Sequence, residues 1–277
     1  MILFPNAKIN IGLDILRRRA DGYHDISTLM YPIGWCDVLE MVPSEGNDMT
    51  LTVTGNRVDC PTEKNLVMKA ARLMCNVADI PATDIYLHKI IPDGAGMGGG
   101  SADAAFTLLG LNELYGLGFD KEQLAAFAAR LGADCPFFIY NEPMLAEGVG
   151  EQLSKANIDL SGYGIVVVKP DFSISTAEAY GGVKPRVPEL HLTERLGADM
   201  RGWKESIKND FVNHLSQKYR EIDEVTEWLY GRGAIYASMT GSGSAVFGIF
   251  QDADTADIAR GEYEKIHAEW YFYSGKL

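Results

Sequence analysis

Five glycines occupy seven positions from 94 to 100 and separate a strand pattern from a helix pattern. Ile85–Ile91 alternates apolar and polar residues, and Ser101–Tyr115 repeats apolar residues at helical spacing. Glycine leaves backbone N–H groups unshielded and reaches positive φ without strain. A helix N-terminus after such a loop presents unpaired N–H groups and the positive end of its dipole. The segment therefore predicts a loop that binds phosphate.

We expect Ser101 to cap the following helix and to bond a phosphate oxygen or its metal ion. A flexible loop before a Ser-capped helix is the alternative without function. The loop is not a P-loop, because no Gly-Lys-Ser/Thr ending follows it. Gly94, Gly96 and Gly99 do match the spacing of a dinucleotide-binding fold, which stays open. That fold would also need a chain-initial βαβ unit and an acidic residue about 20 positions further on, and neither is present.

The other patterns mix strands and helices without regular βαβ alternation, which favours an α+β fold over a doubly wound sheet. The first strands are expected to form an antiparallel sheet: Ile9–Ile15, Ile26–Ile33, Val38–Val42 and Met49–Val53. Further strands are expected after residue 160: Tyr163–Val168, Ile235–Met239, Ala245–Phe250 and Trp270–Tyr273. The last of these is expected to be an edge strand. Helices are expected to begin after the capping residues Asn65, Asp120 and Ser175. Two more helices are expected over Ile222–Tyr230 and Thr255–His267. The segment Val183–Trp203 gives no clear pattern.

A length of 277 residues favours two domains. The polar stretch Gly148–Asp159 predicts a boundary, which we place between residues 1–152 and 153–277.

Composition excludes several classes of protein. Lys and Arg number 25 against 38 Asp and Glu, a net charge of −13, so no basic face is present to neutralise nucleic acid. The four cysteines lie far apart without a CxxC pair, which excludes a zinc ribbon and a dense disulfide framework. No apolar run reaches the roughly 18 residues of a membrane span, and Met1–Lys8 does not read as a signal peptide. We expect a cytoplasmic protein with no membrane partner.

Two polar clusters interrupt apolar segments far from the glycine loop. Pro5–Asn10 lies in the first strand pattern and contains Lys8, and Ser238–Ala245 lies between two later strands. A lysine on a buried strand needs an acidic partner or an anionic ligand. The periodicity leaves two placements of Lys8 open, one buried and one facing solvent.

Pro5–Asn10, Gly94–Ala104 and Met239–Ala245 together resemble the three motifs of the galactokinase, homoserine kinase, mevalonate kinase and phosphomevalonate kinase (GHMP) superfamily. Further motifs are similar to the branch of that superfamily whose acceptor is a cytidine diphosphate conjugate of methylerythritol: Ala7–Asn10, Arg18–His24, Leu131–Phe138, Val166–Tyr180. The resemblance implies a two-domain GHMP kinase fold. Its N-terminal domain would be like ribosomal protein S5 domain 2, its C-terminal domain ferredoxin-like α+β, and its active site would lie in the cleft between them.

The resemblance also implies an activity, the ATP-dependent phosphorylation of the 2-hydroxyl of that acceptor in isoprenoid precursor synthesis. Asp134 would be the base that takes the hydroxyl proton, and Lys8 its charged partner. A cation beside a carboxylate keeps it ionised and steadies charge on the attacking oxygen. Asp134 also has a purely structural explanation as a helix cap before Cys135-Pro136.

The remaining site residues are carried over by position in the motifs. The ATP-binding set, with magnesium entering on the nucleotide, is Asn65, Pro92, Asp93, Gly94, Ala95, Gly96, Met97, Gly98, Gly99, Gly100 and Ser101. The substrate-binding set is Asn10, Tyr23, His24, Tyr180, Thr240, Gly241 and Gly243. In the family the aromatic at the position of Tyr180 closes a sandwich with the position of Tyr23. No metal ligands are assigned, although Ser101 is a candidate contact.

Two features of the sequence leave other interpretations open. Ala102-Asp103 stands where the family often has Ser-Ser or Ser-Asn, and Arg17–Arg19 fits a solvated surface as well as a site that attracts the diphosphate. Another superfamily kinase with a small hydroxylated acceptor is one alternative function, and a nucleotide-binding regulator without turnover is another. The sequence leaves monomer and homodimer both open.

Overall fold

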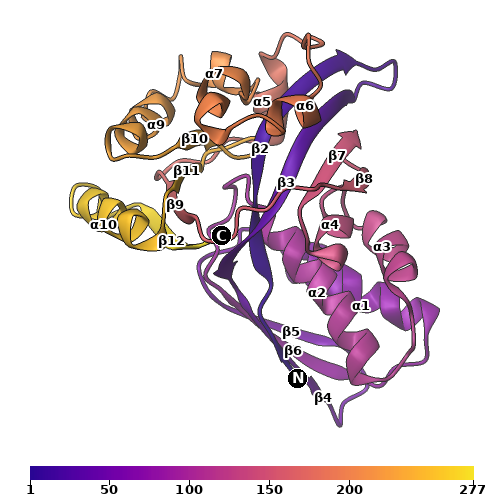
Figure 1. The fold of residues 1–277 in the computed structure, drawn as a ribbon. Helices are drawn as coiled ribbons and strands as arrows, with labels where there is room; N and C mark the ends of the chain where they lie inside the picture. Colours follow the sequence, from indigo (N-terminus) through magenta and orange to yellow (C-terminus); the bar gives the residue numbers. More distant parts are fainter. The chain divides into compact units, whose positions relative to one another are not determined.

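The computed structural model describes residues 1–277 and divides into two compact units (Figure 1). Unit 1 comprises residues 1–7, 35–93 and 98–142, and unit 2 comprises residues 8–34, 94–97 and 143–277. The sequence predicts one domain boundary at residue 152, whereas each compact unit consists of several segments that alternate along the chain. The reason is that the long early strands belong to the sheet of unit 2, although they precede all of the helices of unit 1.

Unit 1 contains a four-stranded sheet of β1 (Ile2–Leu3), β4 (Val38–Pro43), β5 (Thr50–Gly55) and β6 (Thr83–Lys89), in the order β1-β4-β6-β5. The strands expected around Val38 and Met49 are confirmed, but the expectation of a purely antiparallel sheet is wrong. β5 pairs with β6 in parallel, because the intervening helix α1 (Leu66–Val77) carries the chain back to the same end of the sheet. The glycine loop follows β6 in a mixed sheet, which does not support a doubly wound dinucleotide fold.

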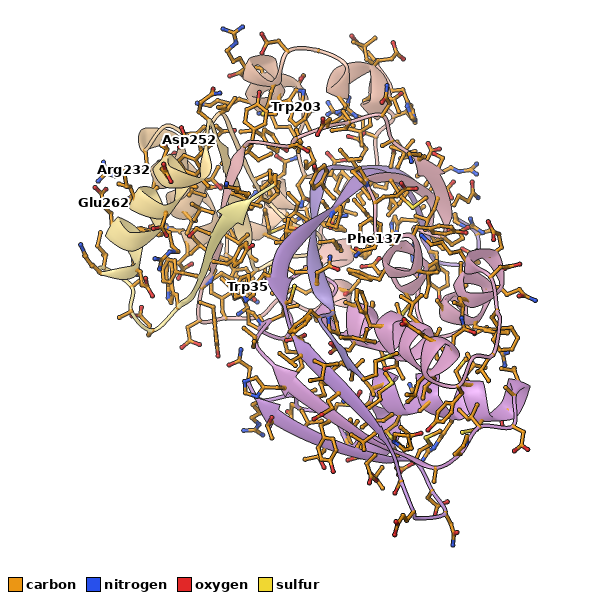
Figure 2. All side chains as sticks on the ribbon, turned by 60° about the horizontal axis from the view of Figure 1, so that its bottom comes forward. Trp35, Phe137, Trp203, Arg232, Asp252 and Glu262 are labelled. Carbon is orange, nitrogen blue, oxygen red and sulfur yellow. The ribbon has the colours of Figure 1, made fainter.

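One face of this sheet is covered by helices, and the other is open. Side chains of β6 alternate between buried and exposed, as a strand with one covered face requires. α1 and α2 (Gly99–Leu114) pack on the sheet, and α3 (Lys121–Ala129) and α4 (Cys135–Tyr140) pack on α2. Asn65 caps α1 and an Asp120–Gln123 capping box opens α3, as the sequence predicts. Phe137 of α4 is fully buried in this unit (Figure 2).

Unit 2 is built around the antiparallel sheet β10-β11-β9-β12. Its strands are β9 (Gly164–Lys169), β10 (Tyr236–Met239), β11 (Val246–Phe250) and β12 (Tyr271–Lys276), with β12 at an edge as expected. α9 (Glu221–Gly231) and α10 (Ala253–Glu264) pack on the sheet and carry the two crossovers. In chain order the strands lie 4-1-3-2, which is the predicted ferredoxin-like βαββαβ arrangement. Figure 2 shows Arg232 and Glu262, which join the ends of these helices by an exposed ion pair.

A second sheet has the order β2-β3-β7-β8 and lies mostly in unit 2. It consists of β2 (Asn6–Arg18), β3 (His24–Cys36), β7 (Met144–Gly148) and β8 (Gln152–Lys155). Short helices fill the connection from β9 to α9: α5 (Thr176–Gly181), α6 (Leu192–Leu196), η2 (Met200–Gly202), α7 (Trp203–Ser206) and α8 (Val212–Leu215). Another 3-10 turn, η1 (Thr62–Lys64), precedes α1. No helix has the length and the apolar character that crossing a membrane would require.

A buried cluster of three charges lies beneath the start of α2 in unit 1. Lys89 donates from Nζ to Asp37 and, at 2.7 Å, to Asp103 Oδ2, and all three residues are at most 5% exposed. Asp37 also accepts the N–H groups of Ile90 and Ile91, whereas Asp103 Oδ1 has no hydrogen-bond partner. Burial raises the pKa of Asp103 because it removes water from the charged form, and the neighbouring carboxylate of Asp37 raises it further. The two carboxylates outweigh the effect of burial on Lys89 and raise its pKa.

We predict that this cluster makes stability depend on pH with a definite sign. A carboxyl group whose pKa is raised by folding contributes less to stability as pH rises, because the unfolded chain gives up its proton first. The free energy of unfolding of the wild-type protein minus that of Asp103→Asn should therefore fall between about pH 4 and about pH 7. Urea denaturation across this range measures the difference. Asp79→Asn, which removes an exposed carboxyl group, is the control. A difference that rises for Asp103→Asn would mean that Lys89 keeps this carboxyl ionised.

Candidate active site

Lys8 lies on the buried side of β2, so its solvent-facing placement is excluded. It is 3% exposed, and Nζ donates to the carbonyl oxygen of Gly96 at 3.2 Å and to Asn10 Oδ1. Asn10 Nδ2 in turn donates to Thr28 Oγ1 at 3.0 Å, and the Thr28 hydroxyl donates to the Gly12 carbonyl at 2.6 Å. Since the Thr28 proton is already used, Thr28 can only accept from Asn10, and this turns the amide oxygen of Asn10 towards the ammonium.

Residues 239–245, which we call the Thr240 loop, join this group from the other end of the chain. The Thr240 hydroxyl accepts the Asn10 N–H at 3.0 Å and donates to the Gly96 carbonyl at 3.2 Å. Gly96 has φ +72°, and a Cβ there would lie 2.2 Å from the Thr240 carbonyl oxygen. A Cβ at Gly241, also at positive φ, would lie 2.8 Å from the Gly96 oxygen. These glycines are therefore required by the close approach of two backbones.

More contacts within unit 2 hold residues 94–97 in place. The Met97 carbonyl accepts the Lys8 N–H at 3.0 Å, and the Ala95 carbonyl accepts the Ala245 N–H at 3.3 Å. Gly94 lies against Ser173, whose Oγ is 2.9 Å from the position of a Cβ. Gly243, another predicted substrate residue, lies at positive φ within the Thr240 loop. Three segments that are distant in sequence thus meet around Lys8 within unit 2.

The predicted base-binding aromatics only partly come together. His24 and Tyr180 are stacked, with ring centroids 4.8 Å apart and planes inclined by 21°. Tyr180 also packs edge-on against Phe211, whereas Tyr23 is 66% exposed at the hairpin. A Tyr23–Tyr180 sandwich stays a prediction, and the ring that faces Tyr180 here is His24. Burial, and secondarily the charge of Arg18, lower the pKa of His24, which keeps its ring neutral with one donor and one acceptor.

Part of the basic Arg17–Arg19 segment is already neutralised. Arg17 and Arg19 form ion pairs with Asp25, and Arg19 also pairs with Asp21. These contacts favour the interpretation of the segment as a charged surface of the hairpin.

In unit 1 the second half of the glycine loop forms the start of α2. Gly98 is the N-terminal cap at φ +72° and supplies no side-chain bond, and the helix begins at Gly99. The prediction that Ser101 caps this helix is therefore wrong, because the glycines continue the helix for two residues ahead of it. Ser101 lies in the first turn, with its hydroxyl near the Cys135 thiol. Burial raises the pKa of that thiol to about 11, so it stays protonated near neutral pH.

Asp134 immediately precedes α4 and is half-buried. Its backbone is helical, with φ −81° and ψ −17°, and its side chain makes no capping bond to α4. Capping therefore does not explain a carboxylate at this position. The contact of the adjacent Cys135 with Ser101 places Asp134 near the first turn of α2 within unit 1.

The other predicted ATP-binding residues of unit 1 lie around the same helix end. Asn65 caps α1 by accepting the Val67 N–H at 2.9 Å, and the Cβ position of Gly100 is 3.9 Å from Leu66. The N-termini of α1 and α2 are therefore adjacent. Pro92 is buried and Asp93 is exposed just before the loop divides between the units.

The glycine segment fits a polyphosphate group. Gly94, Gly96 and Gly98 have positive φ. Because Gly98 caps α2 without a side chain, the first N–H groups of this 16-residue helix have no side-chain acceptor at the cap. For magnesium, no group of three or more His, Cys, Asp or Glu side chains is placed to hold an ion. An ion carried by nucleotide phosphates needs few protein ligands, and the Ser101 hydroxyl fits such a role.

The sequence interpretation missed the charged cluster that supports the glycine helix. A Cβ at Gly99 would lie 3.4 Å from Lys89 Nζ, so the ammonium lies directly behind the first residue of α2. A signal was present, because Lys89 falls on the same face of the strand pattern as the buried Ile85 and Leu87. Asp103 lies between buried alanines of α2, where a carboxylate also requires a partner.

Comparison with protein families gives two matches. The model described as GHMP kinases N terminal domain matches residues 65–142, and the model described as GHMP kinases C terminal matches residues 193–267. A protein of Parabacteroides distasonis named 4-diphosphocytidyl-2-C-methyl-D-erythritol kinase is 47% identical over 251 residues, covering 91% of this chain and 92% of that protein. A protein of the same name from Bacteroides fragilis is 46% identical over 252 residues, covering 90% and 92%.

Solved structures resemble the whole chain. A crystal structure of 4-(cytidine 5'-diphospho)-2C-methyl-D-erythritol kinase matches with a TM-score of 0.85 and 35% identity, covering 100% of this chain and 99% of that one. A homoserine kinase from Cytophaga hutchinsonii matches with a TM-score of 0.70 and 18% identity, covering 98% and 94%. The second match shows a likeness of fold alone.

Gly96→Ala tests the close approach of the glycine loop to the Thr240 loop. The added Cβ meets a backbone oxygen at 2.2 Å and the backbone is left-handed, so we expect a loss of roughly 2–4 kcal/mol in the free energy of unfolding. Gly100→Ala is the matched control, because the nearest atom is 3.9 Å away and the position is helical. Chemical denaturation measures both, and equal stabilities would contradict the observed packing.

Proposed function

Because this chain belongs to the GHMP kinases, and within them to the family of 4-diphosphocytidyl-2-C-methyl-D-erythritol kinases, we propose that it transfers the γ-phosphoryl group of ATP to the 2-hydroxyl of 4-diphosphocytidyl-2-C-methyl-D-erythritol. The resemblance that the sequence motifs predict is confirmed at the level of the family. The enzyme is a small-molecule kinase, and its reaction is an ATP-dependent step of isoprenoid precursor synthesis.

The observation that carries the assignment of the acceptor site is the burial and fixed orientation of Lys8. Its positively charged ammonium donates to a carbonyl oxygen and to an amide oxygen, and these contacts fix its direction. Such a charge suits an alcohol that becomes an alkoxide during transfer. The main-chain N–H groups at the start of α2 suit the triphosphate, which this acidic chain must bind without a lysine-ended P-loop.

In the proposed mechanism Asp134 accepts the proton of the 2-hydroxyl and Lys8 stabilises the oxygen that attacks the γ-phosphorus. The proposal requires both side chains to flank the same hydroxyl group. The transition state of phosphoryl transfer is usually loose, so positioning and charge stabilisation are expected to contribute more than proton removal. A magnesium ion bound with ATP would neutralise phosphate charge, with Ser101 as the candidate protein contact.

Recognition of the acceptor is proposed to use the aromatic and glycine-rich parts of unit 2. The stacked His24 and Tyr180 offer ring faces to a pyrimidine, and the neutral imidazole offers a donor and an acceptor to its edge. Tyr23, exposed on the hairpin, is free to cover the base from the other side. Thr240, Gly241 and Gly243 are proposed to line the acceptor end, and Asn10 to bond the methylerythritol.

The side assigned to ATP comprises the glycine segment and Asn65, whose helix N-terminus is adjacent to that of α2. A cytoplasmic location and a monomeric or homodimeric state stay predictions from the sequence.

Asp134→Ala should lower kcat by about 10²–10⁴ while ATP still binds, because the general base is lost and the helix N-terminus is unchanged. Steady-state kinetics with the cytidyl acceptor and calorimetry with ATP measure the two effects. Asp120→Asn is the matched control, since Asn caps α3 as well as Asp does and the residue is exposed. Unaltered turnover in Asp134→Ala would remove Asp134 from the mechanism.

His24→Ala and Tyr180→Ala should each raise KM for the cytidyl acceptor by roughly 5- to 150-fold, because stacking of a base on a ring contributes about 1–3 kcal/mol. KM for ATP should not change. Tyr86→Ala, on the open sheet face of unit 1, is the control for the loss of a partly exposed ring. A rise in KM for ATP alone would place these rings on the nucleotide side.

The experiment that tests the proposed function is a coupled assay of ATP consumption with a panel of acceptors. Turnover should require the cytidine diphosphate conjugate. Phosphorylation of homoserine or mevalonate at a similar rate would contradict the assignment of the pyrimidine site, and no ATP consumption with any acceptor would favour a regulator.

A further inference from the structure

The irregular segment between α5 and α9, which includes the stretch Val183–Trp203 without a clear sequence pattern, reaches the Thr240 loop through the side chain of Asn209. Asn209 lies between α7 and α8 and is 3% exposed. Its Nδ2 donates to the carbonyl oxygens of Met239 and Gly241, both at 2.9 Å. These two carbonyls belong to the residues on either side of Thr240. One amide group therefore holds the Thr240 loop on both sides of the residue that contacts Asn10 and Gly96.

The orientation of this amide is fixed by a third bond. Asn209 Oδ1 accepts the N–H of Phe211 at 3.0 Å, so both N–H groups of the amide point towards the loop. A carbonyl oxygen can only accept, and the position therefore requires a donor. A carboxylate of the same shape would keep the bond from Phe211 but would place oxygen against oxygen at the other two contacts.

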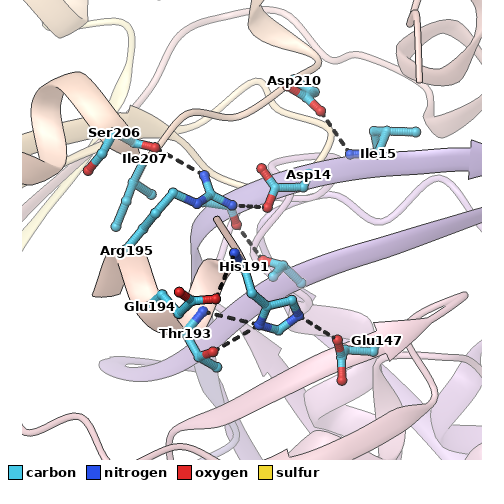
Figure 3. A network of polar contacts seen from close by, with 12 residues as sticks. Asp14, Ile15, Glu147, His191, Thr193, Glu194, Arg195, Ser206, Ile207 and Asp210 are labelled. Atoms are coloured by element: carbon cyan, nitrogen blue, oxygen red, sulfur yellow. Dashed lines mark hydrogen bonds and ion pairs between the residues drawn. The ribbon is translucent and has the colours of Figure 1, made fainter. Parts of the chain in front are cut away.

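The backbone around Asn209 is bonded along β2. Leu13 donates its N–H to the Lys208 carbonyl and accepts the Asp210 N–H, both at 2.9 Å. The Ile15 N–H donates to Asp210 Oδ2 at 2.8 Å (Figure 3). Asn209 is thus fixed against the same strand that carries Lys8 and Asn10.

A buried ion pair attaches the preceding helix to that strand. Arg195 of α6 pairs with Asp14 of β2, and both side chains are less than 10% exposed. Arg195 also donates to the Ser206 carbonyl at 3.0 Å, so one guanidinium joins α6, the end of α7 and β2 (Figure 3). The pair and the bonds along β2 leave Asn209 little freedom to move relative to Lys8.

We propose that Asn209 is a positioning residue for phosphoryl transfer, which acts through the Thr240 loop on Lys8 and rests on the proposed function for its role in turnover. The Thr240 hydroxyl bonds the Asn10 N–H and the Gly96 carbonyl, and the same carbonyl accepts from the Lys8 ammonium. A shift of the loop therefore displaces the oxygen that orients the ammonium. Small displacements at a reacting centre are sufficient to slow transfer strongly.

Asn209→Asp and Asn209→Ala should each lower kcat by about 10- to 100-fold without changing KM for ATP. Asn112→Asp is the matched control, because the Asn112 amide bonds the N–H and the carbonyl of Phe119 and fixes a turn at the far end of α2. The control should lower the thermal midpoint as Asn209→Asp does and keep the wild-type kcat. A wild-type kcat in Asn209→Asp, or an equal loss in the control, would overturn the proposal.

Hydrogen exchange supplies a measurement that needs no turnover. The amides of Asn10 and Gly243 bond the Thr240 side chain and carbonyl, so they should exchange faster in Asn209→Asp, whereas those of β9 should not. Unchanged exchange at Asn10 and Gly243 would overturn the positioning role. If the wild-type enzyme fails to phosphorylate the cytidyl acceptor while exchange behaves as expected, the proposed function fails and the structural coupling of Asn209 to the loop stands.

Discussion

The buried ammonium of Lys8 is the constraint on which the rest of the site depends. A charge that is 3% exposed requires polar partners, and these include the amide of the nearby Asn10 and the carbonyl of Gly96, which is distant in sequence. Meeting this requirement fixes the glycine segment, orients Asn10 through Thr28 and brings in the Thr240 hydroxyl. In the proposed mechanism the positive charge of the ammonium stabilises an anionic oxygen. The contacts that satisfy a folding requirement are therefore also those that would hold Lys8 in place in the proposed mechanism.

In unit 1 the main electrostatic feature is the start of α2. The start of α2 presents main-chain donors after a glycine cap, and the cluster of Lys89, Asp37 and Asp103 lies beneath it. The backbone N–H groups supply a local positive potential, although the chain as a whole carries a net charge of −13. A potential that backbone groups supply does not depend on net charge, so an acidic chain can present it as well as a basic one.

Much of this was predictable from the sequence, for identifiable reasons. Helix starts at Asn65 and Asp120 follow from local capping bonds, and the strands follow from alternating burial. The start of α2 was predicted two residues too late, because Gly99 and Gly100 have low helix propensity and are kept helical by packing. The parallel pairing of β5 and the role of Asn209 depend on contacts between residues far apart in sequence, which no local pattern encodes. The burial of Lys89 could have been predicted, since strand periodicity places it on the buried face.

A double-mutant cycle on Lys8→Met and Asp134→Asn, measured as kcat for the cytidyl acceptor, tests the central claim most directly. If the ammonium and the carboxylate act on one hydroxyl as a unit, the double variant should be little slower than the slower single variant. Losses that simply multiply would show that the two groups act independently, and would contradict the account.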